Sequence, residues 1–133
     1  MHIHTVLYGV NVRMELRMRD LLLQCSGLAA IVLALIHGLL GETKVFARAS
    51  IEPPRLRTLI RLVWQAGTVA WIGGGVLLLV APWLESSLAR HWIVATLAIV
   101  FGFAALANAF ATRGRHFGWV GMGAVVALAV AGY

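Results

Sequence analysis

The sequence predicts an all-α integral membrane protein, an up-down bundle of four helices that forms a single membrane domain over residues 1–133. Four long apolar stretches without Asp, Glu, Lys or Arg support this prediction: residues 21–40, 62–84, 92–111 and 117–133. Each is near the length that a helix needs to cross a hydrocarbon core of about 30 Å, and the last is at the short end of that range. The links between the stretches are short, which favours antiparallel neighbours.

The composition predicts the same class. Hydrophobic residues make up 61% of the chain and charged residues only 12%, which is outside the usual balance of soluble domains. A net charge of +6 indicates nucleic-acid binding in a soluble chain, but here the basic residues are concentrated outside the apolar stretches. We therefore expect a lipid bilayer as the environment and no nucleic acid as a partner. Cys25 is the single cysteine, so no internal disulfide can form.

The links predict the orientation in the membrane. The first and third links, residues 41–61 and 112–116, hold seven Lys or Arg, against four in residues 1–20 and the second link. Basic residues favour the cytoplasmic side of a membrane. We therefore expect a bacterial inner-membrane protein with both termini outside. Arg113 and Arg115 then form a cytoplasmic basic hairpin before the last stretch.

Aromatic residues at the ends of the stretches support the same boundaries. Trp64 and Trp119 lie near one predicted interface, and Trp83, Trp92 and Tyr133 lie near the other. Amphipathic aromatic rings favour the headgroup level of a bilayer.

The first 20 residues have a basic end followed by an apolar run, as a signal peptide does. However, the stretch at 21–40 is longer than a signal core, and no small-residue cleavage site follows it. Met18 is an alternative start. We expect residues 1–17 to contribute little to folding.

Small residues at spacings of three and four predict where the helices touch, because spans associate through close packing. The positions we expect at helix contacts are Gly27, Gly38, Gly41, Gly74 and Gly102. These stripes are expected to form the core of the bundle. The alternative is that one of them faces a partner subunit, since a bundle this small cannot hide every stripe.

Polar residues near one membrane boundary form the candidate site. His37 and Asn108 lie three residues before the ends of their stretches, and Gln65 lies three after the start of its own. At about 1.5 Å per residue, all three sit at one depth. Polar groups in a span usually face the interior and pair, so we expect His37 to hydrogen-bond Gln65 or Asn108. Glu42 and His116 lie just beyond this layer.

Residues His37-Gly38-Leu39-Leu40-Gly41-Glu42 resemble the H-S-x-L-G-E signature of short, uncharacterised bacterial four-span membrane proteins. The segment 113–116, followed by Trp119, is similar to their basic hairpin before the last span. The resemblance covers the chain from about residue 20 onward, with Gly38 where Ser is typical. It implies a four-span bundle and singles out His37, Gly41 and Glu42, and it brings no established activity.

These observations predict a structural or accessory subunit of a homo-oligomer or of a larger membrane complex. Because a neutral imidazole can bind haem iron or a metal ion, the alternative is a small haem-, quinone- or metal-binding redox protein organised on His37. A small oligomeric transporter is a further alternative, although no span contains a carboxylate for proton coupling. No catalytic residues are assigned, because no nucleophile lies near a base and no phosphate-loop, dinucleotide or zinc-protease motif is found.

Overall fold

The computed structural model describes the backbone of residues 2–133 and the side chains of residues 11–133. Within these residues the chain is helical and contains no strand, which confirms the all-α prediction. The elements are α1 (His2–Leu40), the π-helical turn η1 (Gly41–Phe46), α2 (Pro54–Val80), the 3₁₀ turn η2 (Ala81–Trp83), α3 (Ser87–Thr112) and α4 (Gly118–Ala131).

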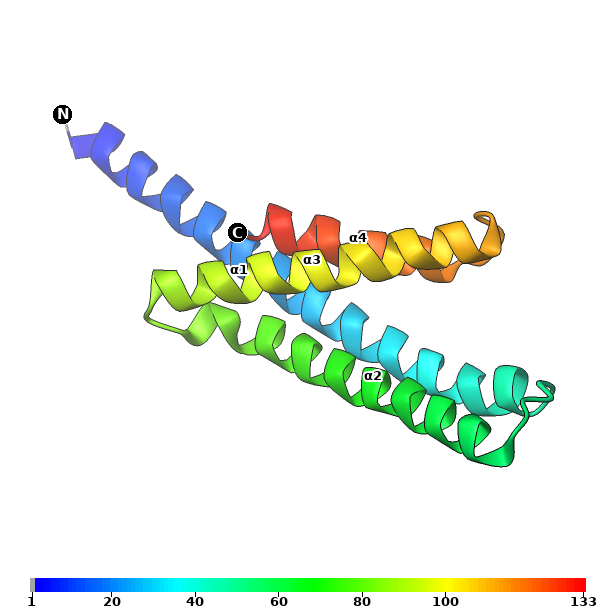
Figure 1. Cartoon of the computed structure of the whole chain (residues 1–133). Coiled ribbons are helices and arrows are strands. Elements are labelled where there is room, and N and C mark those ends of the chain that lie inside the picture. The colour runs from blue at the N-terminus through cyan, green and yellow to red at the C-terminus, as the bar shows by residue number, and fades with distance from the viewer. Residues whose placement is uncertain (1) are drawn as a thin grey trace.

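The four helices form two antiparallel hairpins, α1 with α2 and α3 with α4 (Figure 1). Contacts are extensive within each hairpin and between α1 and α4, but sparse between α2 and α3. The helices α2 and α3 meet where Trp71 contacts Phe101 and where Gly74 faces Leu97. The up-down bundle is therefore open along the α2–α3 side, and α1 joins the two hairpins.

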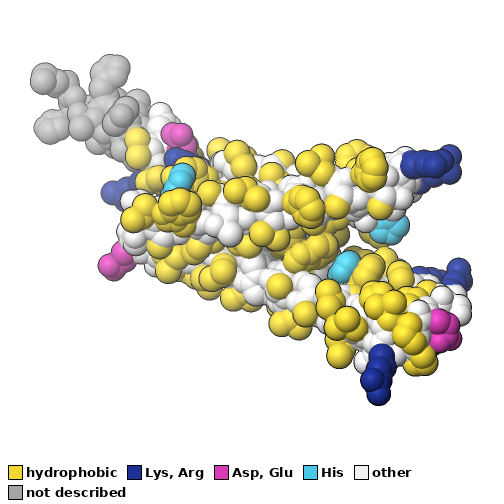
Figure 2. Space-filling model, in the orientation of Figure 1, with side chains coloured by type: hydrophobic (Ala, Val, Ile, Leu, Met, Phe, Trp, Pro, Cys, Tyr) yellow, Lys and Arg dark blue, Asp and Glu magenta, His cyan; other side chains and the backbone are white. Residues whose placement is uncertain are grey.

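Three segments are long and apolar enough to cross a membrane: Asn11–Phe46, Pro54–Trp83 and Ser87–Thr112. Hydrophobic side chains cover much of the visible face of both hairpins, while charged side chains lie near their ends (Figure 2). The fourth apolar helix, α4, has 14 residues and is shorter than the predicted span at 117–133. At 1.5 Å per residue α4 is about 21 Å long, less than a hydrocarbon core of about 30 Å.

The first helix begins well before the predicted boundary at residue 21. Residues 11–20 contain no Gly or Pro and are rich in Arg, Met, Leu and Glu, which favour helix. Residues 11–18 are all exposed, and the N-terminal part of α1 projects beyond the other helices (Figure 1). This exposure supports the prediction of a minor folding role for residues 11–17. The side chains of residues 1–10 lie outside the described part.

The other helix starts also differ from the predicted boundaries. The helix α2 begins at Pro54 instead of residue 62, because a proline is well tolerated in the first turn of a helix. The helix α3 begins at Ser87 instead of residue 92, and the Ser86 hydroxyl caps it by accepting a hydrogen bond from the Ala89 amide at 3.2 Å. The first link is correspondingly short, since η1 extends the first helix to Phe46.

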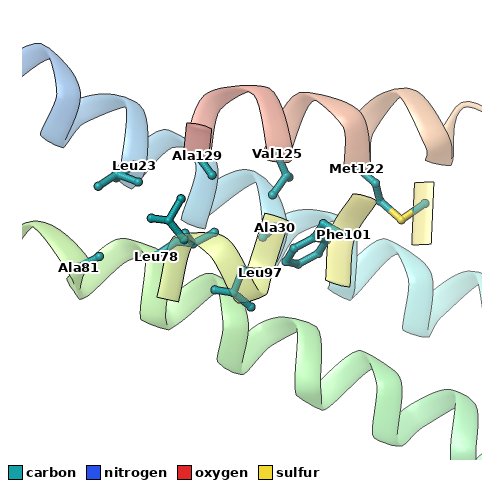
Figure 3. Close-up of a cluster of buried hydrophobic side chains, with 10 residues drawn as sticks. Leu23, Ala30, Leu78, Ala81, Leu97, Phe101, Met122, Val125 and Ala129 are labelled. Atoms are coloured by element: carbon teal, nitrogen blue, oxygen red, sulfur yellow. The ribbon is translucent and has the colours of Figure 1, made fainter. Parts of the chain in front are cut away.

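The hydrophobic core lies in the half of the bundle nearer to the α2–α3 link. All four helices contribute to it, and its largest fully buried side chains are Phe101 of α3, Leu23 of α1 and Leu78 of α2 (Figure 3). Its buried residues are Leu23, Ala30, Leu78, Ala81, Val94, Leu97, Phe101, Met122, Val125 and Ala129.

Two close contacts lie on neighbouring faces of α1: the first is within the α1–α2 hairpin, and the second joins the two hairpins. A Cβ atom at Gly27 would lie 2.5 Å from the Gly75 carbonyl oxygen, and one at Gly75 would lie 2.7 Å from the Gly27 carbonyl oxygen. The backbones of α1 and α2 therefore touch directly. On the next face, the buried Ser26 hydroxyl donates a hydrogen bond of 2.7 Å to the Val125 carbonyl of α4.

We expect Gly27→Val to lower the free energy of unfolding by about 1–3 kcal/mol, because the new side chain has backbone atoms in its way. Gly73→Val is the matched control, since nothing lies within 4 Å of a Cβ atom there. Thermal unfolding in detergent, followed by circular dichroism, measures both. Equal losses in the two variants would show that Gly27 is not a contact position.

Candidate functional site

The His37 side chain on α1 packs against two tryptophans of α2. Its ring is stacked on Trp64, with centroids 4.2 Å apart and planes 5° from parallel, and it also contacts Trp71 at 4.6 Å. Trp71 in turn contacts Phe101 of α3 at 5.6 Å. Offset or stacked rings of this kind add stability beyond the area they bury. His37 is thus part of a row of aromatic rings that reaches from the first hairpin to the second.

The π-helical turn after α1 brings Trp64 close to the backbone of the first helix. The indole Nε1 donates a hydrogen bond of 3.1 Å to the His37 carbonyl oxygen. Gly41 permits this approach, because a Cβ atom there would overlap the Trp64 ring. Since π-helical turns are rare and often occur at functional sites, this segment is a candidate in its own right.

Glu42 and Gln65 form a polar cluster with Arg61 beside this turn. Gln65 Nε2 donates to Glu42 Oε1 at 2.7 Å and to the Gly38 carbonyl at 3.3 Å. Arg61 donates from Nε to the same carboxylate oxygen at 3.0 Å, and its Nη2 lies 2.7 Å from Glu42 Oε2. Both oxygens of the Glu42 carboxylate therefore have partners within this chain.

The predicted hydrogen bond from His37 to Gln65 or Asn108 is wrong. Among the described side chains, the hydrogen bonds of Gln65 go to Glu42 and Gly38, and none reaches the His37 ring. The physical reason is the close stacking on Trp64, which turns the imidazole along the α1–α2 contact. The shared depth predicted that Gln65 lies beside this turn of α1, where it bonds the Gly38 carbonyl, but not the direction of the imidazole around the helix.

Asn108 and His116 belong to a second cluster, on the other hairpin. The Gly118 amide donates to His116 Nδ1 at 3.1 Å, and a Cβ atom at Gly118 would lie 3.3 Å from Asn108 Nδ2. The buried Asn108 Oδ1 has no hydrogen-bond partner in the described part of the chain. The predicted polar layer is thus divided between the hairpins, and Figure 2 shows a hollow between their ends with histidine side chains on both sides.

Arg113 and Arg115 lie in the tight turn between α3 and α4, as the hairpin prediction requires. Arg113 adopts a left-handed conformation with φ of 51°, and Gly114 follows with φ of 73°. The side chains of Arg113 and Arg115 are exposed. A hydrogen bond of 3.1 Å from Trp119 Nε1 to the Gly114 carbonyl closes the turn.

Of the glycines predicted at helix contacts, four lie at close approaches. Gly27 faces Gly75, and Gly41 faces Trp64. A Cβ atom added at Gly38 would lie 2.9 Å from the Thr68 side chain. A Cβ atom added at Gly74 would lie 2.8 Å from the Leu97 side chain. Gly102 is the exception: nothing lies within 4 Å of a Cβ atom there, because that side of α3 points away from the other helices.

A third cluster, which the sequence reasoning missed, lies at the opposite end of the bundle. Arg90 Nη2 donates to the Pro82 carbonyl at 3.0 Å, and Nη1 lies 3.7 Å from Asp20 Oδ1. Nearby, a hydrogen bond of 2.8 Å joins His91 Nδ1 and the Tyr133 hydroxyl. The available signal was positional, because Asp20 and Arg90 each precede an apolar stretch and these stretches run in the same direction.

Within the searched residues, no group of three or more His, Cys, Asp or Glu side chains is arranged to hold a metal ion. Comparison of the chain with protein-family models, with curated proteins and with solved structures finds no match. The functional argument therefore depends on the geometry described above.

We expect His37→Phe to be tolerated, because it keeps a flat ring between Trp64 and Trp71. His37→Gln keeps a donor and an acceptor but loses the stacking, so it should lower the free energy of unfolding by about 0.5–1.5 kcal/mol. Thermal unfolding of both variants in the same detergent gives the comparison. A stable His37→Gln and an unstable His37→Phe would instead assign His37 a hydrogen-bonding role.

Proposed function

We propose that this protein is a structural or accessory subunit of a membrane complex, and that it joins a second copy of itself or another membrane protein through the outer face of α3. In this proposal it is a multi-pass protein of a bacterial inner membrane. The resemblance of residues 37–42 to a signature of bacterial four-span proteins supports that location.

The observation that supports this proposal best is the position of Gly102 between large exposed apolar side chains on α3. A helical glycine costs about 1 kcal/mol relative to alanine. Gly102 is one of four helical glycines, with Gly67, Gly73 and Gly123, at which an added Cβ atom would have no neighbour within 4 Å, and it lies on the least buried candidate span. Gly102 lies three residues after Ile99 and four before Leu106, and their exposed fractions are both 73%. Together they present a small hollow between large apolar side chains, the surface that close packing of membrane helices uses.

The position of α3 in the bundle supports the same proposal. In its most apolar window only 17% of residues are buried, compared with 33% in the first candidate span and 22% in the second. Phe103 and Phe110 extend the exposed apolar face, at 74% and 89% exposure. Lipid covers such a face as well as protein does, and the mass of the solubilised assembly distinguishes the two.

We expect Gly102→Leu to leave the fold of the chain unchanged and to reduce the mass of the assembly. Gly73→Leu is the matched control, since it makes the same change on α2, at a glycine where nothing lies within 4 Å of an added Cβ atom. Multi-angle light scattering of the detergent-solubilised protein gives the mass. A multiple of the 14.4 kDa chain indicates self-association, and an additional protein indicates a different partner.

A monomeric wild-type protein with no stoichiometric partner would contradict the proposal, as would equal effects of Gly102→Leu and Gly73→Leu. The absorption spectrum of the same preparation tests the redox alternative. A Soret band that is lost in His37→Leu would favour a haem protein organised on His37 over a structural subunit.

The excess of Lys and Arg in the first and third links supports an orientation with both termini outside. We expect alkaline phosphatase fused after Tyr133 to be active and a cytoplasmic reporter at the same site to be inactive. The same reporters inserted at Ser50, in the first link, should give the opposite result. Cytoplasmic activity at Tyr133 would reverse the assignment.

A further inference from the structure

A cavity of about 410 Å³ lies at the end of the bundle where the α2–α3 link meets α1 and the last residue, Tyr133. This volume is within the range of about 300–1,000 Å³ that is typical of small-molecule sites. Its charged lining consists of Arg19, Asp20, Glu85 and Arg90. Two positive and two negative side chains thus face one half-open space, and none of the assignments above uses it.

The two arginines of this cavity have guanidinium hydrogen-bond donors that no group of the described chain uses. Arg90 is held in place through one nitrogen by the Pro82 carbonyl, but its Nη1 lies 3.7 Å from Asp20, which is too long for a hydrogen bond. Arg19 makes no side-chain hydrogen bond or ion pair within the described part of the chain. Guanidinium groups with unused donors match the oxygens of a phosphate.

The acidic side chains favour a ligand that also carries a positive charge. Asp20 is 40% exposed, and Glu85 is exposed without an ion pair in the described structure. An anionic ligand would have to approach these carboxylates uncompensated, whereas a zwitterion places an ammonium group beside them. The equal numbers of acidic and basic side chains in the lining therefore select against a purely anionic ligand.

The apolar surroundings indicate that the ligand is a lipid. Leu16 and Leu84 line the same cavity. Leu16 is 53% exposed, so an apolar side chain of the lining is open to the surroundings of the bundle. Trp83 also lies at this end, and such aromatic residues favour the headgroup level of a bilayer.

We propose that this cavity binds the headgroup of a zwitterionic phospholipid. The phosphate lies between Arg19 and Arg90, the ammonium group faces Asp20 and Glu85, and the acyl chains leave the cavity past Leu16 and Leu84. A primary ammonium has three donors, so phosphatidylethanolamine should bind at least as well as phosphatidylcholine.

Native mass spectrometry of the full chain in detergent tests this proposal. The protein is incubated with equal amounts of phosphatidylethanolamine, phosphatidylcholine and phosphatidylglycerol, and the bound lipids are identified. We expect one tightly bound zwitterionic lipid, and about tenfold weaker binding in Arg90→Gln, the loss that removal of a charge-assisted hydrogen bond implies. Arg115→Gln, an equal change of charge at the opposite end, should bind as the wild type does.

Two further variants keep the test independent of folding. Arg19→Gln and Glu85→Gln remove side chains that have no partner in the described structure, so both proteins should fold and both should bind the lipid more weakly. Unchanged binding in both would overturn the proposal, as would preferential binding of phosphatidylglycerol. Displacement of the lipid by inorganic phosphate would show that the site takes free phosphate instead, and persistence of the lipid supports a headgroup site.

Discussion

The direct backbone contact between α1 and α2 at Gly27 and Gly75 is the constraint on which the rest of the structure depends. Membrane helices gain no hydrophobic energy by leaving lipid, so close packing and hydrogen bonds must hold them together. Once α2 covers this face of α1, the adjacent face is left for α4, where the Ser26 hydroxyl reaches the Val125 carbonyl. The remaining helix, α3, packs mainly on α4.

From that crossing the two hairpins diverge, and this divides the chain into a packed half and an open half. The core residues lie around this crossing, from Ala81 beside the α2–α3 link to Phe101 and Met122 on the other side. At the other end each hairpin must satisfy its own polar groups. The first does so with the hydrogen bonds of Gln65 and Trp64 to α1, and the second with those around His116. The predicted polar layer is split for this reason.

The sequence was sufficient to predict an all-helical chain with its long apolar stretches and the close approaches at Gly27 and Gly41, because apolar length and side-chain volume are local properties. It could not predict the partner of His37. Depth follows from counting residues, but direction around the helix depends on the crossing of α1 and α2. The π-helical turn had no signal beyond Gly41 itself. The sequence contained enough information to predict the pairing of Asp20 with Arg90. In an up-down bundle the first and third stretches run in the same direction, so the residues that precede them lie at one end.

The two ends of the bundle differ in how their charges are used. The Glu42 carboxylate accepts from Arg61 and Gln65 at 2.7–3.0 Å, and exposed ion pairs of this kind contribute little stability. Their effect is geometric, because Gln65 also fixes the start of the π-helical turn through Gly38. The Arg90 guanidinium is anchored to a backbone carbonyl, and its nearest carboxylate is beyond hydrogen-bond distance. Arg90 is held in place, and its contact with Asp20 at 3.7 Å leaves guanidinium donors unused, so we propose the ligand site at Arg90 and not at His37.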